Sequence, residues 1–360
     1  GVQTCALPIS VTSYSLLSST VRIRSYVKQA KALGYQTLAI TDINVLHGVV
    51  EFYEACQEAG IQPIIGLRLE YTPAEKEGHS ELLLFAKNLK GYQQLMQLSS
   101  SKMTTEGPFY LAEHQSLLSD LFAVTLSAKG EVAQTFFEDE QQAVHAFQQL
   151  ASYFDPQSLF VEHSFSMNQQ RNPALFSFYQ REQLPGVALQ EVRHLTREEG
   201  FAVTVLESIK ENNQLNITSQ TPEIEGLNYL REAETTMEQM LQIAGAEVVQ
   251  NTIQLAENCR VDIPLHQKLL PHFPVPDNQT AGSYLRTLCL EKLPERVPHL
   301  NEVYQKRLEK ELTIIHNMGF DDYFLIVWDV MDFCHNNQIV TGAGRGSAAG
   351  SLVSYVLSIT

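Results

Sequence analysis

No run of apolar residues in the sequence approaches the roughly 18 that a membrane-spanning helix needs, although hydrophobic residues make up 44% of the chain. The five cysteines are scattered and form no Cys-x-x-Cys pair, which argues against a disulfide framework or a zinc site. These features predict a core-forming protein of a reducing compartment, and we expect a cytoplasmic location. At 360 residues the chain is long enough for two domains.

Basic residues are also scarce. The sequence has 25 lysines and arginines against 41 acidic residues, for a net charge of −16. Residues 271–360 contain 7 basic and 10 acidic side chains, so most of the negative charge belongs to the first 270 residues. A surface that grips nucleic acid is basic. We therefore expect the first 270 residues not to form the main nucleic-acid interface.

The first ten residues lack an initiator methionine and the basic and apolar segments of a signal peptide. Their string Gly-Val-Gln-Thr-Cys-Ala-Leu-Pro-Ile is similar to a translated sequencing adapter. We interpret residues 1–10 as a non-native start of a gene fragment whose other end, at Thr360, is open.

Short apolar runs alternate with helical patterns through the first 200 residues, which is typical of a parallel α/β sheet or barrel. The predicted strands are Leu38–Thr41, Ile64–Tyr71, Leu82–Ala86, Leu121–Leu126, Leu159–His163 and Val187–Gln190. The helical patterns among them include Arg24–Leu33, Val49–Glu58 and Ala143–Tyr153.

The rest of the chain is predicted to be mainly helical. Residues 197–262 have helical spacing, and the proline-rich Leu269–Pro276 indicates a domain boundary. Beyond this boundary the predicted helices are Ala281–Leu293, Glu302–Met318 and Tyr323–Asn336.

The most informative motif is the glycine-rich run Gly342–Ser351. It lies between the apolar Ile339–Thr341 and Leu352–Leu357, an order that predicts a strand, a tight turn and a helix capped by Ser347. Glycines let the backbone approach a ligand, and a helix start and a guanidinium both attract phosphate. No Gly-Lys-Ser/Thr follows, which excludes a Walker A loop. The chemistry alone leaves two interpretations: phosphate binding, or a turn whose small residues allow close packing.

Arg307–Leu312 leads to Met318–Asp329 and then to the glycine-rich run, and this series resembles the palm entry of bacterial replicative DNA polymerase III alpha subunits, the C-family polymerases. Residues 269–276 resemble the junction before that palm. The amino-terminal half resembles the family's PHP (polymerase and histidinol phosphatase) domain at Tyr14–Leu17, Ala39–Asp42, Gly48–Tyr53 and Pro63–Gly66. The resemblance extends from about Val11 to Thr360.

The resemblance implies an α/β fold: a seven-stranded distorted (β/α) barrel of PHP type, followed by a partial, nucleotidyltransferase-like polymerase palm with helices. The six predicted strands, with one more near the start, supply the seven. The implied PHP domain covers residues 11–268, with its barrel reaching about 196 and a helical extension over 197–268. The amino-terminal part of the palm covers residues 269–360.

The activity implied for the parent protein is template-directed nucleotidyl transfer from a dNTP to a primer 3′-hydroxyl, with two Mg²⁺ ions. Its implied partners are primer–template DNA, the sliding clamp and the clamp loader. The palm resemblance assigns Gly344, Arg345, Gly346 and Ser347 to the dNTP phosphates, and it places the catalytic aspartates beyond Thr360. We therefore expect this fragment to be inactive alone. Two alternatives remain: a PHP-type metal-dependent phosphoesterase or exonuclease, and a non-catalytic replisome scaffold.

An active PHP domain holds metal ions with histidines and carboxylates, and this sequence departs from that pattern. The family's opening His-x-His-Ser falls at about Ile9–Thr12, where no histidine stands. Its Thr-Asp-His becomes Thr41, Asp42 and Ile43, and Arg68 replaces a glutamate. The late Asp-x-His becomes Glu191, Val192 and Arg193, and arginine stays protonated and cannot ligate a metal. We expect no metal at Asp42, Ile43, Arg68, Glu191 and Arg193, and interpret the domain as a structural remnant.

Two histidines, His47 and His194, lie beside these positions and leave a shifted metal site as an alternative. We favour ordinary polar or partly buried histidines, because a metal site needs a full set of matched ligands.

Four aspartates precede the glycine-rich run: Asp321, Asp322, Asp329 and Asp332. Asp329 and Asp332 share one helix face, which offers a possible Mg²⁺ pair. We favour helix caps and a solvated face, and we expect Trp328 to lie in the core rather than to stack on a base.

Overall fold

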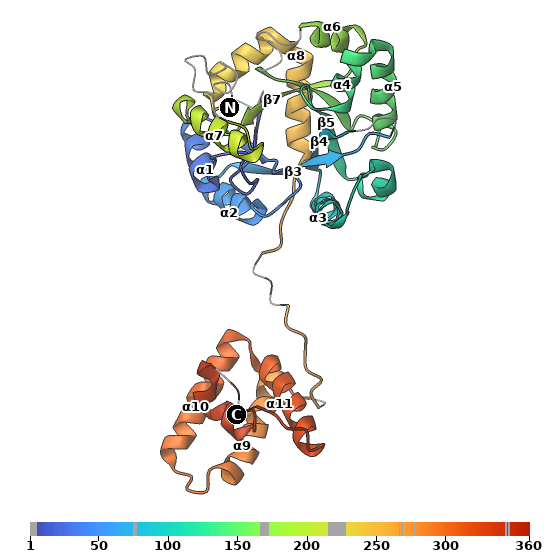
Figure 1. Cartoon of the computed structure of the whole chain (residues 1–360). Helices are drawn as coiled ribbons and strands as arrows, with labels where there is room; N and C mark the ends of the chain where they lie inside the picture. The colour runs from blue at the N-terminus through green and yellow to red at the C-terminus, as the bar shows by residue number, and fades with distance from the viewer. Residues whose placement is uncertain are drawn as a thin grey trace. The chain divides into compact units, whose positions relative to one another are not determined.

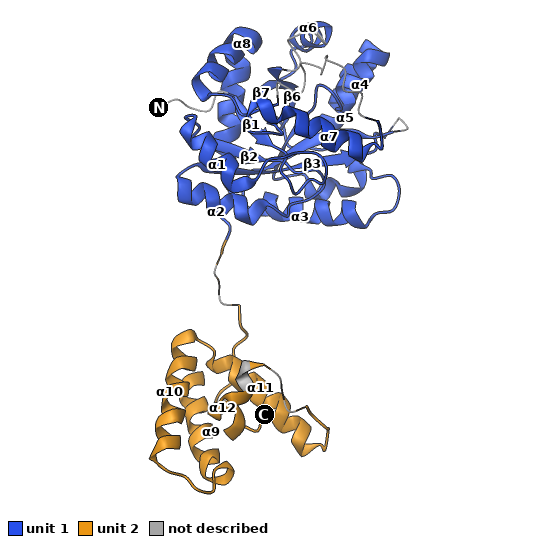
Figure 2. Ribbon diagram, turned by 60° about the vertical axis from the view of Figure 1, so that its left-hand side comes forward, with its two compact units in different colours: residues 1–263 blue, residues 264–360 orange. Residues whose placement is uncertain are grey.

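The computed structural model describes residues 6–74, 78–165, 173–214, 228–265, 267, 269–276, 278–342, 344 and 346–360, except for the side chains of Ser347 and Ala348. The chain forms two compact units, Gly1–Ile263 and Pro264–Thr360, shown in Figure 2. Unit 2 begins at residue 264, five residues before the boundary that the sequence analysis predicted at residue 269. Among the described residues, no helix combines the length and the apolar character needed to cross a membrane.

Unit 1 is a closed barrel of seven strands within its described residues (Figure 1). The strands are β1 Leu7–Ser10, β2 Thr37–Ile40, β3 Gln62–Tyr71, β4 Ser80–Ala86, β5 Leu121–Thr125, β6 Leu159–His163 and β7 Gly186–Val192. They follow one another around the wall in sequence order, and β1 closes the barrel against β7. Only β4 runs antiparallel to its neighbours. The structure confirms the seven-stranded α/β barrel.

Helices surround the wall of the barrel (Figure 1). They are α1 Ile23–Ala32, α2 Val49–Ala59, α3 Leu89–Thr104, α4 Glu131–Glu138, α5 Glu140–Ala151, α6 Pro173–Arg181, α7 Gly200–Lys210 and α8 Ala233–Asn258. In α1 the buried side chains Ile23, Tyr26, Val27 and Ala30 recur at helical spacing, so one face packs on the barrel. The same spacing made this helix predictable from the sequence.

The first strand lies in the segment that the sequence analysis interpreted as a non-native start. Leu7 and Ile9 are completely buried, and β1 pairs with both β2 and β7. These residues therefore complete the wall of the barrel, which would otherwise be open between β2 and β7.

The core of unit 1 has two layers, because successive side chains of a strand point to opposite faces. In β3, Ile64 belongs to the interior of the barrel, whereas Ile65, Leu67 and Leu69 pack outward against the helices. The interior layer also contains Leu83, Val124, Phe160, Val187 and Leu189. Both faces of the wall are buried, which explains why the strands read as nearly continuous apolar runs.

The described part of unit 2 is helical. Its helices are α9 Ala281–Arg296, α10 Glu302–Met318, α11 Asp321–Asn336 and α12 Leu352–Val356. The bounds of α10 agree with the predicted helix, because the Asn301 side chain caps its start and Gly319 ends it at φ 71°. A short 3₁₀ turn, Ser347–Gly350, precedes α12.

Two expectations for the glycine-rich region were wrong. Ile339–Thr341 forms no strand, and the described residues of unit 2 contain no strand with which it could pair. Val340 is 97% exposed. The cap of the following helix is Ser351, whose hydroxyl accepts the N–H of Ser354, and not Ser347. Ser347 instead begins the 3₁₀ turn.

Candidate functional site

Strand alternation brings a group of charged side chains into the barrel interior. Arg68 lies four residues after Ile64 on β3, and Glu191 lies two residues after Leu189 on β7. These even spacings place both side chains on the inward face of their strands. Glu162 follows Phe160 on β6 in the same way. Because β4 is antiparallel, Glu81 near its start lies beside the end of β3. Barrel enzymes build their sites at this carboxyl end of the strands.

The charged side chains form one ion-pair network, here called the barrel network: Arg68, Glu81, Glu191, Arg193 and Glu207. Arg68 Nη2 donates to Glu191 Oε1 at 2.9 Å, and its Nη1 lies 3.4 Å from Glu81 Oε2. Arg193 Nε donates to the same Glu191 oxygen at 2.8 Å, and its Nη1 donates to Glu207 of α7 at 2.6 Å. Glu191 is therefore shared by two guanidinium groups.

Burial and charge oppose each other at Glu191. Burial acts to raise the pKa of this carboxyl, but Arg193 and Arg68 outweigh it and lower the pKa to about 2. Glu191 in turn raises the pKa of Arg193. Glu162 has no such cation at contact distance among the described residues. Burial raises its pKa, although the Ser127 N–H and hydroxyl each donate to Oε2 at 2.8 Å. Glu191 is thus charged over the ordinary pH range.

Asp42 remains at its expected place but serves a local structural role. Its carboxylate accepts the Thr12 N–H at 2.7 Å, the Thr12 hydroxyl at 2.8 Å and the Ser15 hydroxyl at 2.6 Å. Burial raises the pKa of Asp42, and these hydrogen bonds oppose the rise. The backbone N–H of Ile43 donates to Ser15 at 2.9 Å, and its side chain is a hydrocarbon. Asp42 thus fastens the loop that follows β1.

These residues do not fit a metal ion. The Arg68 side chain is 3% exposed and places a permanent cation among the carboxylates. Glu191 is already paired with two guanidinium groups. Across the described ranges, no group of three or more His, Cys, Asp or Glu side chains gathers as a metal site would require.

The two neighbouring histidines lie in different environments. His47 is exposed. His194 is completely buried, and its Nδ1 lies 2.7 Å from the carbonyl oxygen of Thr196. Neither is brought together with a set of carboxylates within the described part of unit 1.

The glycine-rich loop of unit 2, residues 342–350, is only partly described. Gly344 and Gly346 have φ values of 77° and 87°, a conformation that glycine adopts readily. A Cβ on Gly344 would lie 3.2 Å from Thr360 Cγ2, whereas a Cβ on Gly346 would meet nothing within 4 Å. The backbone at Gly346 is therefore open to approach. Arg345 and the side chain of Ser347 lie outside the described residues.

Two N–H groups at the start of α12 already have side-chain acceptors. Glu311 Oε2 accepts the backbone N–H of Val353 at 3.1 Å and the hydroxyl of Ser351 at 2.9 Å. Ser351 itself accepts the N–H of Ser354 at 3.2 Å. These contacts reduce the number of donors that the end of the helix could offer to an anion.

Asp321 and Asp322 stand at the start of α11. Asp321 Oδ2 lies 2.9 Å from His316 Nδ1. Asp322 Oδ1 accepts the backbone N–H of Phe273 at 2.8 Å, which ties the segment before α9 to α11. Both carboxylates therefore have structural partners.

Asp329 and Asp332 lie further along α11. Asp329 is exposed, and Asp332 accepts from the Asn336 amide at 2.8 Å. Trp328 packs against the core of unit 2, with its ring centroid 6.4 Å from that of Phe273 and 6.3 Å from that of Tyr284. The aspartates do not gather with other ligands among the described residues.

The sequence analysis missed four of the carboxylates described here: Glu81, Glu162, Glu207 and Glu311. Glu162 could have been found from the two-residue repeat of β6, because it lies two residues after Phe160 and so shares the inward face of the strand. Glu81 required knowledge that β4 is antiparallel. Glu311 is 40 residues from Ser351, and no local pattern connects them.

Comparison with known proteins finds two family models. The PHP domain model matches residues 10–164, and the model of the bacterial DNA polymerase III alpha NTPase domain matches residues 283–360. DNA polymerase III subunit alpha of Bacillus subtilis is 36% identical over 356 residues, and that of Halalkalibacterium halodurans is 36% identical over 357. Each match covers 97% of this chain and 31% of the relative.

The chain thus spans about a third of the length of these relatives. Among solved structures, an amidohydrolase from Chromobacterium violaceum is similar at a TM-score of 0.36 with 11% identity, covering 52% of this chain and 87% of that one. At this TM-score the likeness carries no functional argument.

Proposed function

This chain belongs to the family of bacterial DNA polymerase III alpha subunits, and we propose that it is the amino-terminal part of such a subunit and contributes to template-directed DNA synthesis. In the proposed reaction the primer 3′-oxygen attacks the α-phosphorus of a dNTP, a new phosphodiester bond forms, and pyrophosphate leaves. The observation that carries this proposal is the 36% identity to a DNA polymerase III subunit alpha over 97% of the chain. Primer–template DNA and dNTPs are the proposed substrates.

We propose that the loop around Gly344, Arg345, Gly346 and Ser347 binds the β- and γ-phosphates of the incoming dNTP. The support from the structure is the open backbone at Gly346 and the positive φ of both glycines. The roles of Arg345, as a cation, and of the Ser347 hydroxyl rest on the sequence. What this loop contributes is binding and orientation of the leaving group.

Metal use is a general feature suggested by the polymerase family and its PHP relatives. We propose Mg²⁺ as the ion of the full-length enzyme, where it would supply positive charge to the phosphates. The described carboxylates of unit 2 do not form a site for it. Its ligands would therefore come from residues of the parent enzyme other than these.

We propose that the barrel of unit 1 is a metal-free structural domain rather than a phosphoesterase. The observation that favours this role is the barrel network, in which Arg68 and Arg193 both pair with Glu191 and place two permanent cations beside it. A domain of this kind suits a docking scaffold for other replisome proteins, with the sliding clamp and the clamp loader as proposed partners. The proposed location is the cytoplasm.

Primer extension tests the polymerase proposal. The full-length polymerase that contains this chain should extend a labelled primer on a complementary template when the four dNTPs are present. Replacement of Gly346 by valine should raise the KM for dNTP, because the added side chain would occupy the open space at the loop. A Gly346→Val enzyme with wild-type dNTP kinetics would leave only the packing interpretation of the loop.

A further inference from the structure

Glu311 joins α10 to the segment that follows the glycine-rich loop. Its Oε2 accepts two hydrogen bonds, from the Ser351 hydroxyl at 2.9 Å and from the Val353 N–H at 3.1 Å. Only 12% of the side chain is exposed. One carboxylate thus binds two donors at the start of α12.

Neighbouring groups hold this carboxylate in place and in its charged form. Arg307, one turn earlier on α10, donates from Nε to Glu311 Oε1. Burial acts to raise the pKa of Glu311, but the hydrogen bonds from Arg307, Val353 and Ser351 outweigh it and lower the pKa. Glu311 is therefore an anion at neutral pH with both oxygens engaged.

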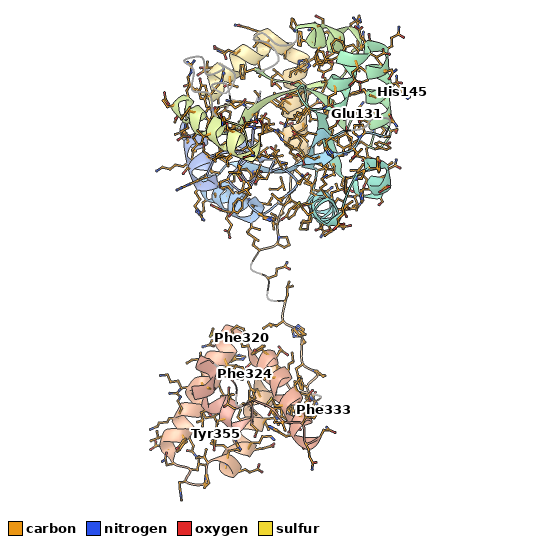
Figure 3. The ribbon with its side chains drawn as sticks, in the orientation of Figure 1. Glu131, His145, Phe320, Phe324, Phe333 and Tyr355 are labelled. Carbon is orange, nitrogen blue, oxygen red and sulfur yellow. The ribbon has the colours of Figure 1, made fainter. Side chains whose placement is uncertain are left out.

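The other end of α12 is also attached to the rest of unit 2. Tyr355, labelled in Figure 3, donates from its hydroxyl to the carbonyl oxygen of Arg296 at 3.2 Å. Arg296 Nε donates back to the carbonyl oxygen of Tyr355 at 3.2 Å. With Glu311 at its start, this five-residue helix is fixed at both ends.

Four of the nine residues from 342 to 350 are glycines, which have no side chain with which to fix a conformation. Gly342, Gly346 and Gly350 have no atoms within 4 Å of where a Cβ would lie. A helix as short as Leu352–Val356 is not stable through its own hydrogen bonds, because helix nucleation is unfavourable. The position of the loop's carboxyl end therefore depends on the contacts that anchor α12, and Glu311 makes the contacts nearest to the loop.

We propose that Glu311 is a positioning residue of the polymerase, which holds the glycine-rich loop in the conformation that receives the triphosphate of the dNTP. This inference rests on the proposed phosphate-binding function of the loop. Glu311 acts through Ser351 and Val353 and has no contact with the substrate. Its negative charge at the start of α12 also repels a second anion there.

Three substitutions separate this role from a general effect on folding. Glu311→Ala removes the acceptor, whereas Glu311→Gln keeps an acceptor oxygen and removes the charge. Glu309→Ala is the matched control, because Glu309 lies on the same helix but pairs with Arg286 on the exposed surface. Each variant is made both in the 360-residue chain and in the full-length polymerase.

The first readout is amide hydrogen exchange in the 360-residue chain. Exchange at Val353, Ser354 and the described loop residues should accelerate at least about tenfold in Glu311→Ala, because hydrogen bonds to a charged acceptor are lost. Glu311→Gln should accelerate exchange less, and Glu309→Ala should match wild type. Unchanged exchange at Val353 and Ser354 in Glu311→Ala would overturn the inference whatever the loop binds.

The second readout is steady-state kinetics of the full-length polymerase. Glu311→Ala should raise the KM for dNTP about tenfold with a smaller effect on kcat, and Glu311→Gln should restore most of the affinity. Faster exchange with an unchanged KM would show that the loop is anchored as described but does not bind phosphates, which would refute the proposed function. Exchange across α9 and α10 shows whether Glu311→Ala unfolds unit 2. If it does, Glu311→Gln is the deciding variant. A wild-type KM together with protected amides at Val353 and Ser354 supports the positioning role, and a raised KM with the same protected amides refutes it.

Discussion

Removal of the Arg68 guanidinium should destabilise unit 1 more than the loss of any exposed ion pair. In Arg68→Met, the apolar part of the side chain is approximately retained, while the contacts to Glu191 at 2.9 Å and to Glu81 at 3.4 Å are lost. Both carboxylates remain in the interior of the barrel with one cation fewer. The matched control is Arg24→Met, because Arg24 and Glu58 form an ion pair with side chains 59% and 65% exposed.

The expected magnitude follows from burial. Breaking a buried ion pair by removing one partner costs about 3–5 kcal/mol when the remaining charge is left without compensation. Here Glu191 keeps Arg193 and Glu81 keeps Lys129 at 3.0 Å, so the loss of Arg68 should cost less, about 1.5–3 kcal/mol, as for a lost hydrogen bond to a charged group. The pKa of Glu191 gives a similar figure: the net drop from 4.5 to about 2, in which the two arginines outweigh burial, corresponds to about 3 kcal/mol in favour of the charged form. An exposed pair such as Arg24–Glu58 contributes about 0–1 kcal/mol.

The assay is urea unfolding at neutral pH followed by circular dichroism, with the midpoint and slope of the unit 1 transition compared among variants. Arg68→Met should lower the free energy of unfolding by about 1.5–3 kcal/mol, and Arg24→Met by less than about 1. The double variant Arg68→Met/Glu191→Gln should recover part of the loss, because it removes one of the two buried carboxylates that lost a cation. Equal effects of Arg68→Met and Arg24→Met would refute the reasoning that the barrel network supports the fold.

Further predictions concern pH, metal content and catalysis. The pKa of Glu191 is depressed in the folded state. The stabilisation of the fold by Glu191 should therefore be present above about pH 4.5 and be lost as the pH falls towards 2. In urea unfolding across that range, Glu191→Gln should reduce the dependence of stability on pH. Elemental analysis of the purified chain should find no stoichiometric zinc or manganese, and phosphodiesterase activity abolished by a chelator would contradict this. The 360-residue chain should incorporate no nucleotide in primer extension, and incorporation that disappears in Asp329→Asn would show that the catalytic aspartates are misassigned. Ser347→Ala in the full-length enzyme should raise the KM for dNTP, because one phosphate hydrogen bond is worth about 1.5–3 kcal/mol.

Several elements were predictable because their signals are local. Asn301 and Gly319 mark the two ends of α10 by capping chemistry, and both were readable in the sequence. The apolar runs of β6 and β3 were recognisable because both faces of the barrel wall are buried. The prediction of a strand at Ile339–Thr341 was wrong although its apolar residues fit one. The described part of unit 2 supplies no partner strand, and Val340 lies in solvent.

The sequence alone determined that the family's metal-ligand pattern is broken in this barrel, because an arginine at position 68 or 193 is a cation in any environment. It also indicated most of the strands and helices of unit 1 in their order, through periodicities that depend on neighbouring residues. Only the tertiary structure decided what replaces the metal ligands. Arg68 and Glu191 are 123 residues apart in sequence, and Glu311 and Ser351 are 40 apart, so these contacts exist only once the barrel closes and the helices pack. Charge and backbone preference are properties of single residues and short segments, whereas the partner of a buried charge depends on which distant residues the fold brings into contact with it.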